Sequence, residues 1–253
     1  MIETIILYFL FYFLVALTGI FVLPRIFSAE LLIKTIKAVN FFETNGRDNL
    51  FFYLVRPLVR MNIHPNVITG IGFLLVTILA ASFWYPISAG HFFIIALLAG
   101  LSDMFDGMLA RALGKITSLG GALDGLRDFF LFSVLTIAVF KNGYISENLI
   151  LLFLIGAVFI EIFKLIEIMV RANKNGFANS FRRRMGGDGK LSVDRTKFFF
   201  YISGLLAFFL ADAVLPAIRI VGFALLGLAV VSVFISILFH GIILVARSRV
   251  CIE

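Results

Sequence analysis

Polar residues divide the chain into long apolar segments joined by short polar connections. The apolar segments fall at about 4–25, 67–86, 90–112, 118–140, 147–171, 197–215 and 219–246. Each is close to the ~20 residues that a helix needs to cross about 30 Å of hydrocarbon, and no alternating pattern of barrel strands is visible. Because a membrane-spanning backbone must satisfy its hydrogen bonds internally, the pattern predicts seven transmembrane helices.

The segment 28–66, between the first two apolar segments, has a different pattern. Two stretches in it, Leu31–Val39 and Phe51–Met61, each carry two basic residues on an otherwise largely apolar background. Basic and apolar residues mixed in this way are typical of helices that lie in the membrane interface. We therefore expect an interfacial, amphipathic segment here.

Composition supports a polytopic membrane protein surrounded by lipid. Of the 253 residues, 61% are hydrophobic and 15% are charged, whereas a soluble domain has about half apolar and a quarter charged residues. The net charge of +7 does not indicate a nucleic-acid partner, because the basic residues lie in connections between apolar spans. The single cysteine, Cys251, excludes an internal disulfide and a cysteine-rich metal site.

The distribution of Lys and Arg predicts the topology. The basic connections are the segment 28–66, the turn at Lys115, the loop 172–196 and the C-terminal tail. Seven crossings place all four on one side, which we expect to be cytoplasmic, with the N-terminus outside. The opposite connections are nearly free of basic residues, Lys141 and Arg219 being the exceptions. The first span lacks the basic start and cleavage site of a signal peptide, so we expect it to be a retained membrane helix.

Carboxylates lie inside two of the apolar segments, in the stretch Leu101–Phe130. This stretch holds four of the eight aspartates of the chain: Asp103, Asp106, Asp124 and Asp128. Each would cost about 2.5–3.5 kcal/mol at the centre of a membrane helix. Carboxylates this costly indicate a function.

The spacing places these aspartates on two helix faces. At i, i+3, i+4, i+7 and i+8, the first face carries Asp103, Asp106, Gly107, Ala110 and Arg111. At i, i+4 and i+8, the second face carries Gly120, Asp124 and Asp128. The turn around Gly114–Thr117 is short enough to make the two helices antiparallel neighbours. The sequence therefore predicts that the four carboxylates converge in one pocket.

Four carboxylates in a medium of low dielectric constant repel one another. Divalent cations relieve that repulsion, and hard oxygen ligands suit Mg²⁺, Mn²⁺ or Ca²⁺. Two such ions would clamp a pyrophosphate and stabilise the attacking and leaving oxygens. Close packing of helices through small residues would explain the glycines, but it would not explain the aspartates.

The stretch from Asp103 to Asp128 reads D-x2-D-G-x2-A-R-x8-G-x3-D-x3-D, and it resembles the signature of the CDP-alcohol phosphatidyltransferase family. The segment from Asn62 to Thr69 is similar to the family's entry to its first core helix. The resemblance implies an all-α integral membrane fold with a six-helix transmembrane core. The chain then divides into an extra N-terminal transmembrane helix at 1–27, the interfacial segment 28–66 and the membrane domain 67–248.

The resemblance also implies a role for individual residues. Two divalent cations, Mg²⁺ or Mn²⁺, would be bound by Asp103, Asp106, Asp124 and Asp128. Asp128 would in addition act as the general base that takes the proton of the acceptor hydroxyl. The nucleotide end of a CDP-linked lipid donor would be bound by Asn66, Thr69, Gly107, Ala110, Arg111 and Gly120. CMP would leave, the active site would lie at the cytoplasmic face, and the protein would be a homodimer.

The acceptor alcohol is open at this point. The loop 172–196 holds a basic group, Arg182, Arg183, Arg184 and Lys190, which is either a solvated positive-inside loop or a site for an acceptor phosphate. Glu161, Lys164 and Glu167 either neutralise one another or line an acceptor path. The segment 161–191 resembles the phosphatidylglycerophosphate synthase branch, which favours a phosphorylated polyol as acceptor, glycerol 3-phosphate first.

Two other functions remain possible from the sequence. The chain would be a CDP-choline or CDP-ethanolamine type of phosphotransferase if diacylglycerol were the acceptor. It would be a transporter if the intramembrane aspartates bound a cation for transport. Transport gives no reason for the spacing of the eight motif positions, and the basic loop favours CDP-diacylglycerol as donor.

Overall fold

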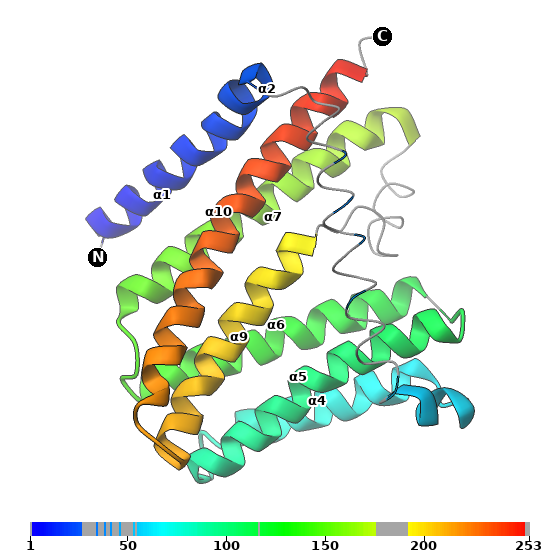
Figure 1. Cartoon of the computed structure of the whole chain (residues 1–253), viewed down its shortest axis with the longest axis vertical. Helices are drawn as coiled ribbons and strands as arrows, with labels where there is room; N and C mark the ends of the chain where they lie inside the picture. Colours follow the sequence, from blue (N-terminus) through cyan, green and yellow to red (C-terminus); the bar gives the residue numbers. More distant parts are fainter. Residues whose placement is uncertain are drawn as a thin grey trace. The chain divides into compact units, whose positions relative to one another are not determined.

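A computed structural model describes residues 2–26, 55–115, 117–175 and 192–250, together with single positions at 34, 38, 41, 46 and 53. Within these ranges the chain forms helices joined by turns, and no strand occurs. The helices, shown in Figure 1, are α1 (Ile2–Leu17), the π-helical turn η1 (Thr18–Val22), α2 (Leu23–Ile26), α4 (Pro65–Ala81), α5 (Ala89–Ala112), α6 (Ser118–Lys141), α7 (Glu147–Asn175), α9 (Ser192–Ala213) and α10 (Ile218–Val250).

The prediction of an all-α integral membrane protein is confirmed. Each predicted apolar segment overlaps a helix. Among the described residues, five helical stretches are long and apolar enough to cross a membrane: Ile2–Val22, Ala89–Ala112, Glu147–Val170, Thr196–Ala213 and Ile218–Val245. Helix α4 is shorter, with 17 residues. It ends at Ala81, and the chain forms a turn from Ser82 onward. The predicted span 67–86 is therefore too long at its C-terminal end.

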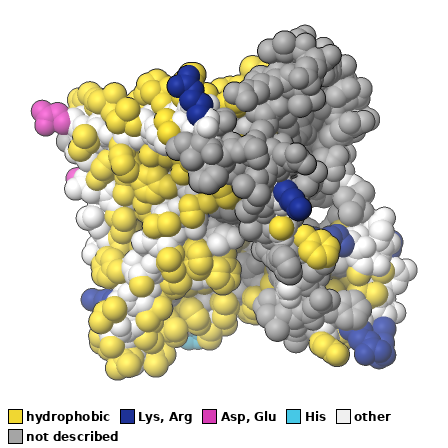
Figure 2. All heavy atoms as spheres, turned by 45° about the horizontal axis from the view of Figure 1, so that its top comes forward, with side chains coloured by type: hydrophobic (Ala, Val, Ile, Leu, Met, Phe, Trp, Pro, Cys, Tyr) yellow, Lys and Arg dark blue, Asp and Glu magenta, His cyan; other side chains and the backbone are white. Residues whose placement is uncertain are grey.

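The described surface is rich in apolar side chains, as a lipid environment requires. Figure 2 shows a face on which hydrophobic side chains cover most of the described surface. On α1, Ile2, Leu7 and Leu14 are 72%, 62% and 61% exposed. These exposures would be costly in water, and they fit a helix that faces hydrocarbon.

The chain forms two compact units. The first comprises 1–44, 146–199 and 227–253, and the second comprises 45–145 and 200–226. In the first unit, α1 packs on α7. In the second unit, α4, α5 and α6 pack on one another. All of the aspartates of the motif lie in this second unit.

Most of the predicted interfacial segment 28–66 lies outside the described residues. Its last part is helical over 55–60 and ends in a turn at Asn62, which has φ 49°. Val55 is buried with Met108 and Leu109 of α5. The end of this segment is therefore anchored on the half of α5 that carries the aspartates.

The turn between α5 and α6 explains why these helices are neighbours. Gly114 has φ +63°, a conformation that glycine adopts without steric cost. The amides of Gly114 and Lys115 donate to the carbonyls of Arg111 and Ala110 at 3.2 and 2.9 Å, which is the Schellman pattern for ending a helix. Thr117 then begins α6, its hydroxyl accepting from the amide of Gly120 at 3.0 Å, as an N-cap does.

A polar cluster lies at the end of the second unit that is remote from the turn between α5 and α6. Asp212, at the end of α9, accepts hydrogen bonds from Arg219 at 2.6 Å and from the hydroxyl of Tyr144. Partial burial and Asp212 together raise the pKa of Tyr144 to about 12, so that this hydroxyl remains a donor at neutral pH.

Trp84 and Tyr85, both 77% exposed, lie in the turn after α4. Aromatic side chains of this kind favour the membrane interface.

In the first unit, the N-terminal helix is held by close contacts with two other helices. Tyr12 is fully buried, and its hydroxyl donates to the carbonyl of Leu152 on α7 at 2.9 Å. A Cβ atom at Gly19 would lie 3.0 Å from the carbonyl oxygen of Leu238 on α10. The small residue at this position permits the backbones of η1 and α10 to approach each other.

Candidate active site

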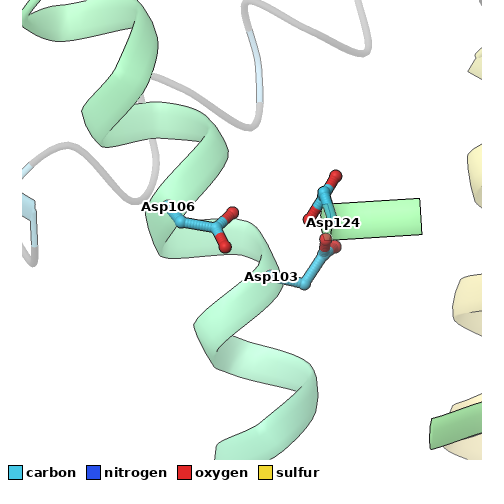
Figure 3. Close-up of side chains that lie close together, drawn as sticks. All are labelled: Asp103, Asp106 and Asp124. Atoms are coloured by element: carbon cyan, nitrogen blue, oxygen red, sulfur yellow. The ribbon is translucent and has the colours of Figure 1, made fainter. Parts of the chain in front are cut away.

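The aspartates of the motif meet between α5 and α6. Figure 3 shows Asp103 and Asp106 on one helix and Asp124 on a second, with their carboxylates directed into the same space. Oxygen atoms of these three side chains all lie within 4.8 Å of one another. The structure thus brings together the carboxylates that the sequence spacing placed on two facing helices.

A guanidinium group joins the fourth aspartate to this cluster. Nη2 of Arg127 lies 2.5 Å from Asp103, 2.5 Å from Asp124 and 3.1 Å from Asp128, and Nη1 lies 2.6 Å from Asp106. The side chain of Arg127 is fully buried. One cation therefore contacts all four carboxylates, and we call Arg127 with these four residues the acidic centre.

Arg127 was not among the residues predicted from the sequence to form the site. A signal was present, because Arg127 follows Gly120 by seven residues and so lies on the same face of α6 as Asp124 and Asp128. An intramembrane arginine beside intramembrane carboxylates is an expected charge partner.

The four carboxylates differ in how exposed their side chains are. The side chain of Asp106 is 6% exposed and that of Asp124 is 28% exposed, whereas Asp103 and Asp128 are 43% and 49% exposed. At 1.5 Å per residue, the aspartates lie about 9–15 Å along the helix axes from the turn between α5 and α6. The centre therefore has a buried side at Asp106 and an open side at Asp103 and Asp128.

Helix α4 forms the floor behind the buried side. The hydroxyl of Thr69 donates to Asp106 at 2.7 Å and is itself buried. One turn further along, a Cβ atom at Gly72 would lie 2.4 Å from Oγ of Ser102 and 2.7 Å from Cδ of Arg127. Glycine at this position is what lets the side chain of Arg127 pass between α4 and α5.

The donor set of the acidic centre fits a divalent metal. Asp103, Asp106 and Asp124 each offer a carboxylate oxygen to a common position, and hard anionic oxygens are the ligands that Mg²⁺ and Mn²⁺ prefer. Sulfur ligands are absent from this group of residues. These three aspartates are therefore suited to hold a metal ion, and Asp128 lies on the open side beside them.

The residues expected to bind a nucleotide lie near the starts of α4 and α6 and in the last turns of α5. A Cβ atom at Gly120 would lie 2.9 Å from the hydroxyl oxygen of Thr117 and 3.7 Å from Oδ1 of Asn66. On α5, Nη1 of Arg111 would lie 3.5 Å from a Cβ atom at Gly107. Ala110 occupies the same helix, one turn from Gly107. Asn66 therefore lies close to Gly120, and the guanidinium of Arg111 lies close to Gly107.

Thr69 differs from the other residues assigned to the nucleotide. It is buried and hydrogen-bonded to Asp106, so its contact in the structure is with a carboxylate of the acidic centre.

The basic residues assigned to the acceptor, Arg182, Arg183, Arg184 and Lys190, lie outside the described residues. Partners within the first unit are seen for Glu161, Lys164 and Glu167 of α7. Lys164 donates to Glu161 at 2.6 Å, and Glu167 is buried against the ring of His240 on α10 at 2.6 Å. His240 is 73 residues from Glu167, and no local pattern indicated this pairing.

The acidic centre and the apolar helices around it define the class of protein: a helical membrane protein with clustered carboxylates between two antiparallel helices. The sequence model of the CDP-alcohol phosphatidyltransferases matches residues 62–238, more than half of the chain. The chain belongs to the CDP-alcohol phosphatidyltransferase family. The match begins at the turn before α4 and includes every residue of the acidic centre.

Two curated relatives are similar over shorter stretches. An archaetidylinositol phosphate synthase of Pyrococcus horikoshii is 35% identical over 105 residues, which are 40% of this chain and 54% of the relative. A CDP-diacylglycerol–glycerol-3-phosphate 3-phosphatidyltransferase of Wigglesworthia glossinidia brevipalpis is 39% identical over 72 residues, or 28% of this chain and 39% of the relative. The chain thus spans about half the length of these relatives or less. No solved structure gives a significant match.

The hydrogen bond from Thr69 to Asp106 gives a prediction about metal binding. A Thr69→Val variant should bind Mn²⁺ about 10–100-fold more weakly, because groups that orient a metal ligand typically contribute that much to affinity. The measurement is the concentration of free Mn²⁺, followed by electron paramagnetic resonance during titration of the detergent-solubilised protein.

The matched control for this variant is Thr77→Val. Thr77 lies on the same helix, where its hydroxyl donates to the carbonyl of Phe73 at 2.9 Å, far from the carboxylates. Equal Mn²⁺ affinities of the two variants would contradict a role for Thr69 in orienting Asp106.

Proposed function

We propose that this protein transfers a phosphatidyl group from CDP-diacylglycerol to an alcohol and releases CMP. The observation that carries the proposal is the acidic centre, in which the aspartates of the family motif meet at the junction of α5 and α6. Residues 62–238 match the family model, and the motif residues assigned to the nucleotide lie around the same junction.

In the proposed reaction the acceptor oxygen attacks the lipid-side phosphorus of the donor. The bond between that phosphorus and the oxygen bridging to CMP breaks, and CMP leaves. Two bound divalent cations, held by Asp103, Asp106, Asp124 and Asp128, would supply positive charge to the pyrophosphate and to the departing CMP. The acceptor's proton passes to a carboxylate oxygen of Asp128.

The chain's own residues support this assignment of roles. Asp128 is one of the two most exposed carboxylates of the centre, so its free oxygen is accessible to an incoming hydroxyl. Asp106 is the most buried and is fixed by Thr69 and Arg127, which suits a ligand that does not move. Arg111 and Gly107 lie nearer the turn, where the nucleotide phosphates would approach.

The acceptor that we propose is a phosphorylated polyol, glycerol 3-phosphate or inositol phosphate. The names of both relatives contain such a group, inositol phosphate in one and glycerol 3-phosphate in the other. In this chain Arg182, Arg183, Arg184 and Lys190 would bind the acceptor's phosphate, because guanidinium groups suit bidentate phosphate contacts.

Release of CMP by the purified protein tests the proposal. Mixed micelles would contain CDP-diacylglycerol with Mg²⁺ or Mn²⁺, and each reaction would contain one acceptor: glycerol 3-phosphate, inositol phosphate, inositol or serine. The proposal predicts release that needs a phosphorylated acceptor and stops with EDTA. Release with inositol or serine alone would contradict the acceptor, and turnover of CDP-choline with diacylglycerol would contradict the donor. No release, together with cation flux into proteoliposomes, would favour a transporter.

The role of Asp128 gives a separate prediction. An Asp128→Asn variant should fold but release CMP about 100- to 10,000-fold more slowly, the range expected for loss of a general base. Rates would be measured at saturating donor and acceptor, so that the difference reports on kcat rather than on binding. A folded variant with the wild-type rate would contradict the assignment of the base.

We further propose that the active site opens to the cytoplasm. Arg111 lies in the last turn of α5 and Lys115 in the turn that follows it, and basic residues favour the cytoplasmic side. The membrane domain that we assign to 67–248 would contain the whole catalytic centre, and the homodimer implied by the family resemblance stays a prediction.

A further inference from the structure

The acidic centre contains a cation of the chain's own. Arg127 contacts Asp103, Asp106, Asp124 and Asp128 at 2.5–3.1 Å, and these are the four residues assigned to the divalent metals. The spacing motif from Asp103 to Asp128 has no fixed residue at position 127. The proposed function therefore leaves this guanidinium without a role.

The position of Arg127 is built into the fold. The side chain of Arg127 passes beside Gly72 of α4, where a Cβ atom on residue 72 would lie 2.7 Å from Cδ of Arg127. It is fully buried, and its Nε atom has no hydrogen-bond partner among the described residues. Burying a guanidinium with an unsatisfied nitrogen is costly. The contacts of its two Nη atoms with the carboxylates are what offset that cost.

The consequence for the carboxylates is electrostatic. Four carboxylates without a cation would repel one another strongly in a medium of low dielectric constant. Arg127 lowers their formal charge from −4 to −3 and bridges α6 to α5 through Asp103 and Asp106. It thus keeps the ligands close together before a metal arrives.

The same contacts oppose a divalent cation. Arg127 occupies an oxygen of each of the four aspartates, and a positive charge at hydrogen-bond distance from these ligands repels a second one nearby. Asp103 and Asp128, the two more exposed aspartates, offer the most accessible carboxylate oxygens to an arriving metal.

We propose that Arg127 is a built-in counter-cation of the acidic centre, which holds the four carboxylates together in the metal-free protein and competes with divalent metal for them. This inference rests on the metal assignment of the proposed function. In this account Arg127 is a positioning residue, which acts on the ligands and not on the substrate. Its presence sets the metal concentration at which the centre fills.

The test compares Arg127→Met with wild type by two readouts that need no turnover. The first is Mn²⁺ affinity in detergent, from free Mn²⁺ measured by electron paramagnetic resonance. The second is the thermal unfolding midpoint with EDTA and with saturating Mn²⁺. We expect Arg127→Met to bind Mn²⁺ at least about tenfold more tightly, to unfold at a lower temperature in EDTA, and to recover most of that difference in Mn²⁺.

The control is Lys141→Met, which removes one positive charge from the far end of the same helix, where Lys141 lies over the ring of Phe83. Its Mn²⁺ affinity should equal that of wild type. If Arg127→Met does not fold, Arg127→Lys replaces it, because one ammonium group contacts fewer carboxylates than the guanidinium and should leave Mn²⁺ binding a few-fold tighter.

Equal or weaker Mn²⁺ binding by the Arg127 variants would overturn the counter-cation role while leaving the metal site in place. Wild-type protein that binds no Mn²⁺ would instead overturn the metal assignment of the proposed function, and this inference with it. The two failures are therefore distinguishable.

Discussion

An Asp106→Asn variant is expected to release CMP at least about 1000-fold more slowly than wild type, because it neutralises the most buried ligand of the proposed metal centre. Asp106 is 6% exposed and holds hydrogen bonds from Thr69 and Arg127. Water has little access to replace the lost carboxylate. The measurement is the initial rate of CMP release at saturating Mn²⁺ and acceptor, normalised to folded protein.

The matched control is Asp212→Asn in the same unit. Asp212 also accepts from an arginine, Arg219 at 2.6 Å, but it lies at the other end of the helices. Its substitution should leave the rate within a few-fold of wild type. If both variants lost activity equally, the loss would reflect membrane folding, and the special place of Asp106 would be contradicted.

A Gly156→Ala substitution is expected to lower the midpoint of thermal unfolding by about 3–10 °C. A Cβ atom at Gly156 would lie 2.5 Å from Cγ1 of Val233 and 2.6 Å from Cζ of Tyr12. Tyr12 would have to move, and it would lose its hydrogen bond to Leu152. Overpacking of this kind costs about 1–3 kcal/mol, and each kcal/mol shifts the midpoint of a chain of this size by about 2–4 °C.

Gly227→Ala is the control for this prediction. Gly227 lies on α10 in the same unit, and no atom lies within 4 Å of a Cβ atom built there. The two substitutions add the same methyl group to a helix, so any difference in midpoint reports on the contacts of Gly156 with Tyr12 and Val233. Equal midpoints would contradict the close packing of the N-terminal helix on α7.

The sequence predicted the elements and the carboxylates of the site because both depend on local spacing. Apolar segments of about 20 residues read directly as helices, and the intervals between Asp103 and Asp128 place the aspartates on two facing surfaces. The short turn at Gly114 made the helices neighbours. Family membership, also predicted from these residues, is confirmed by the match over 62–238.

Contacts between residues distant in sequence were not predictable in this way. The pairing of Glu167 with His240 and the fit of Tyr12 against Gly156 depend on how helices pack, and helix spacing alone carries no such information. Arg127 is an intermediate case. Helix spacing places it on the same face of α6 as Asp124 and Asp128, but spacing does not predict that its side chain passes beside Gly72. The contact of Thr69, which was assigned to the nucleotide, with Asp106 also depends on how α4 packs on α5, and spacing along the chain does not predict it.

The most direct test of the catalytic centre is a diffraction measurement at the manganese edge on crystals grown with Mn²⁺ and CDP. Our account predicts anomalous density in contact with the carboxylates of Asp103, Asp106, Asp124 and Asp128, with the pyrophosphate of CDP on its open side. Anomalous density elsewhere in the protein, or CDP bound away from this cluster, would contradict the account.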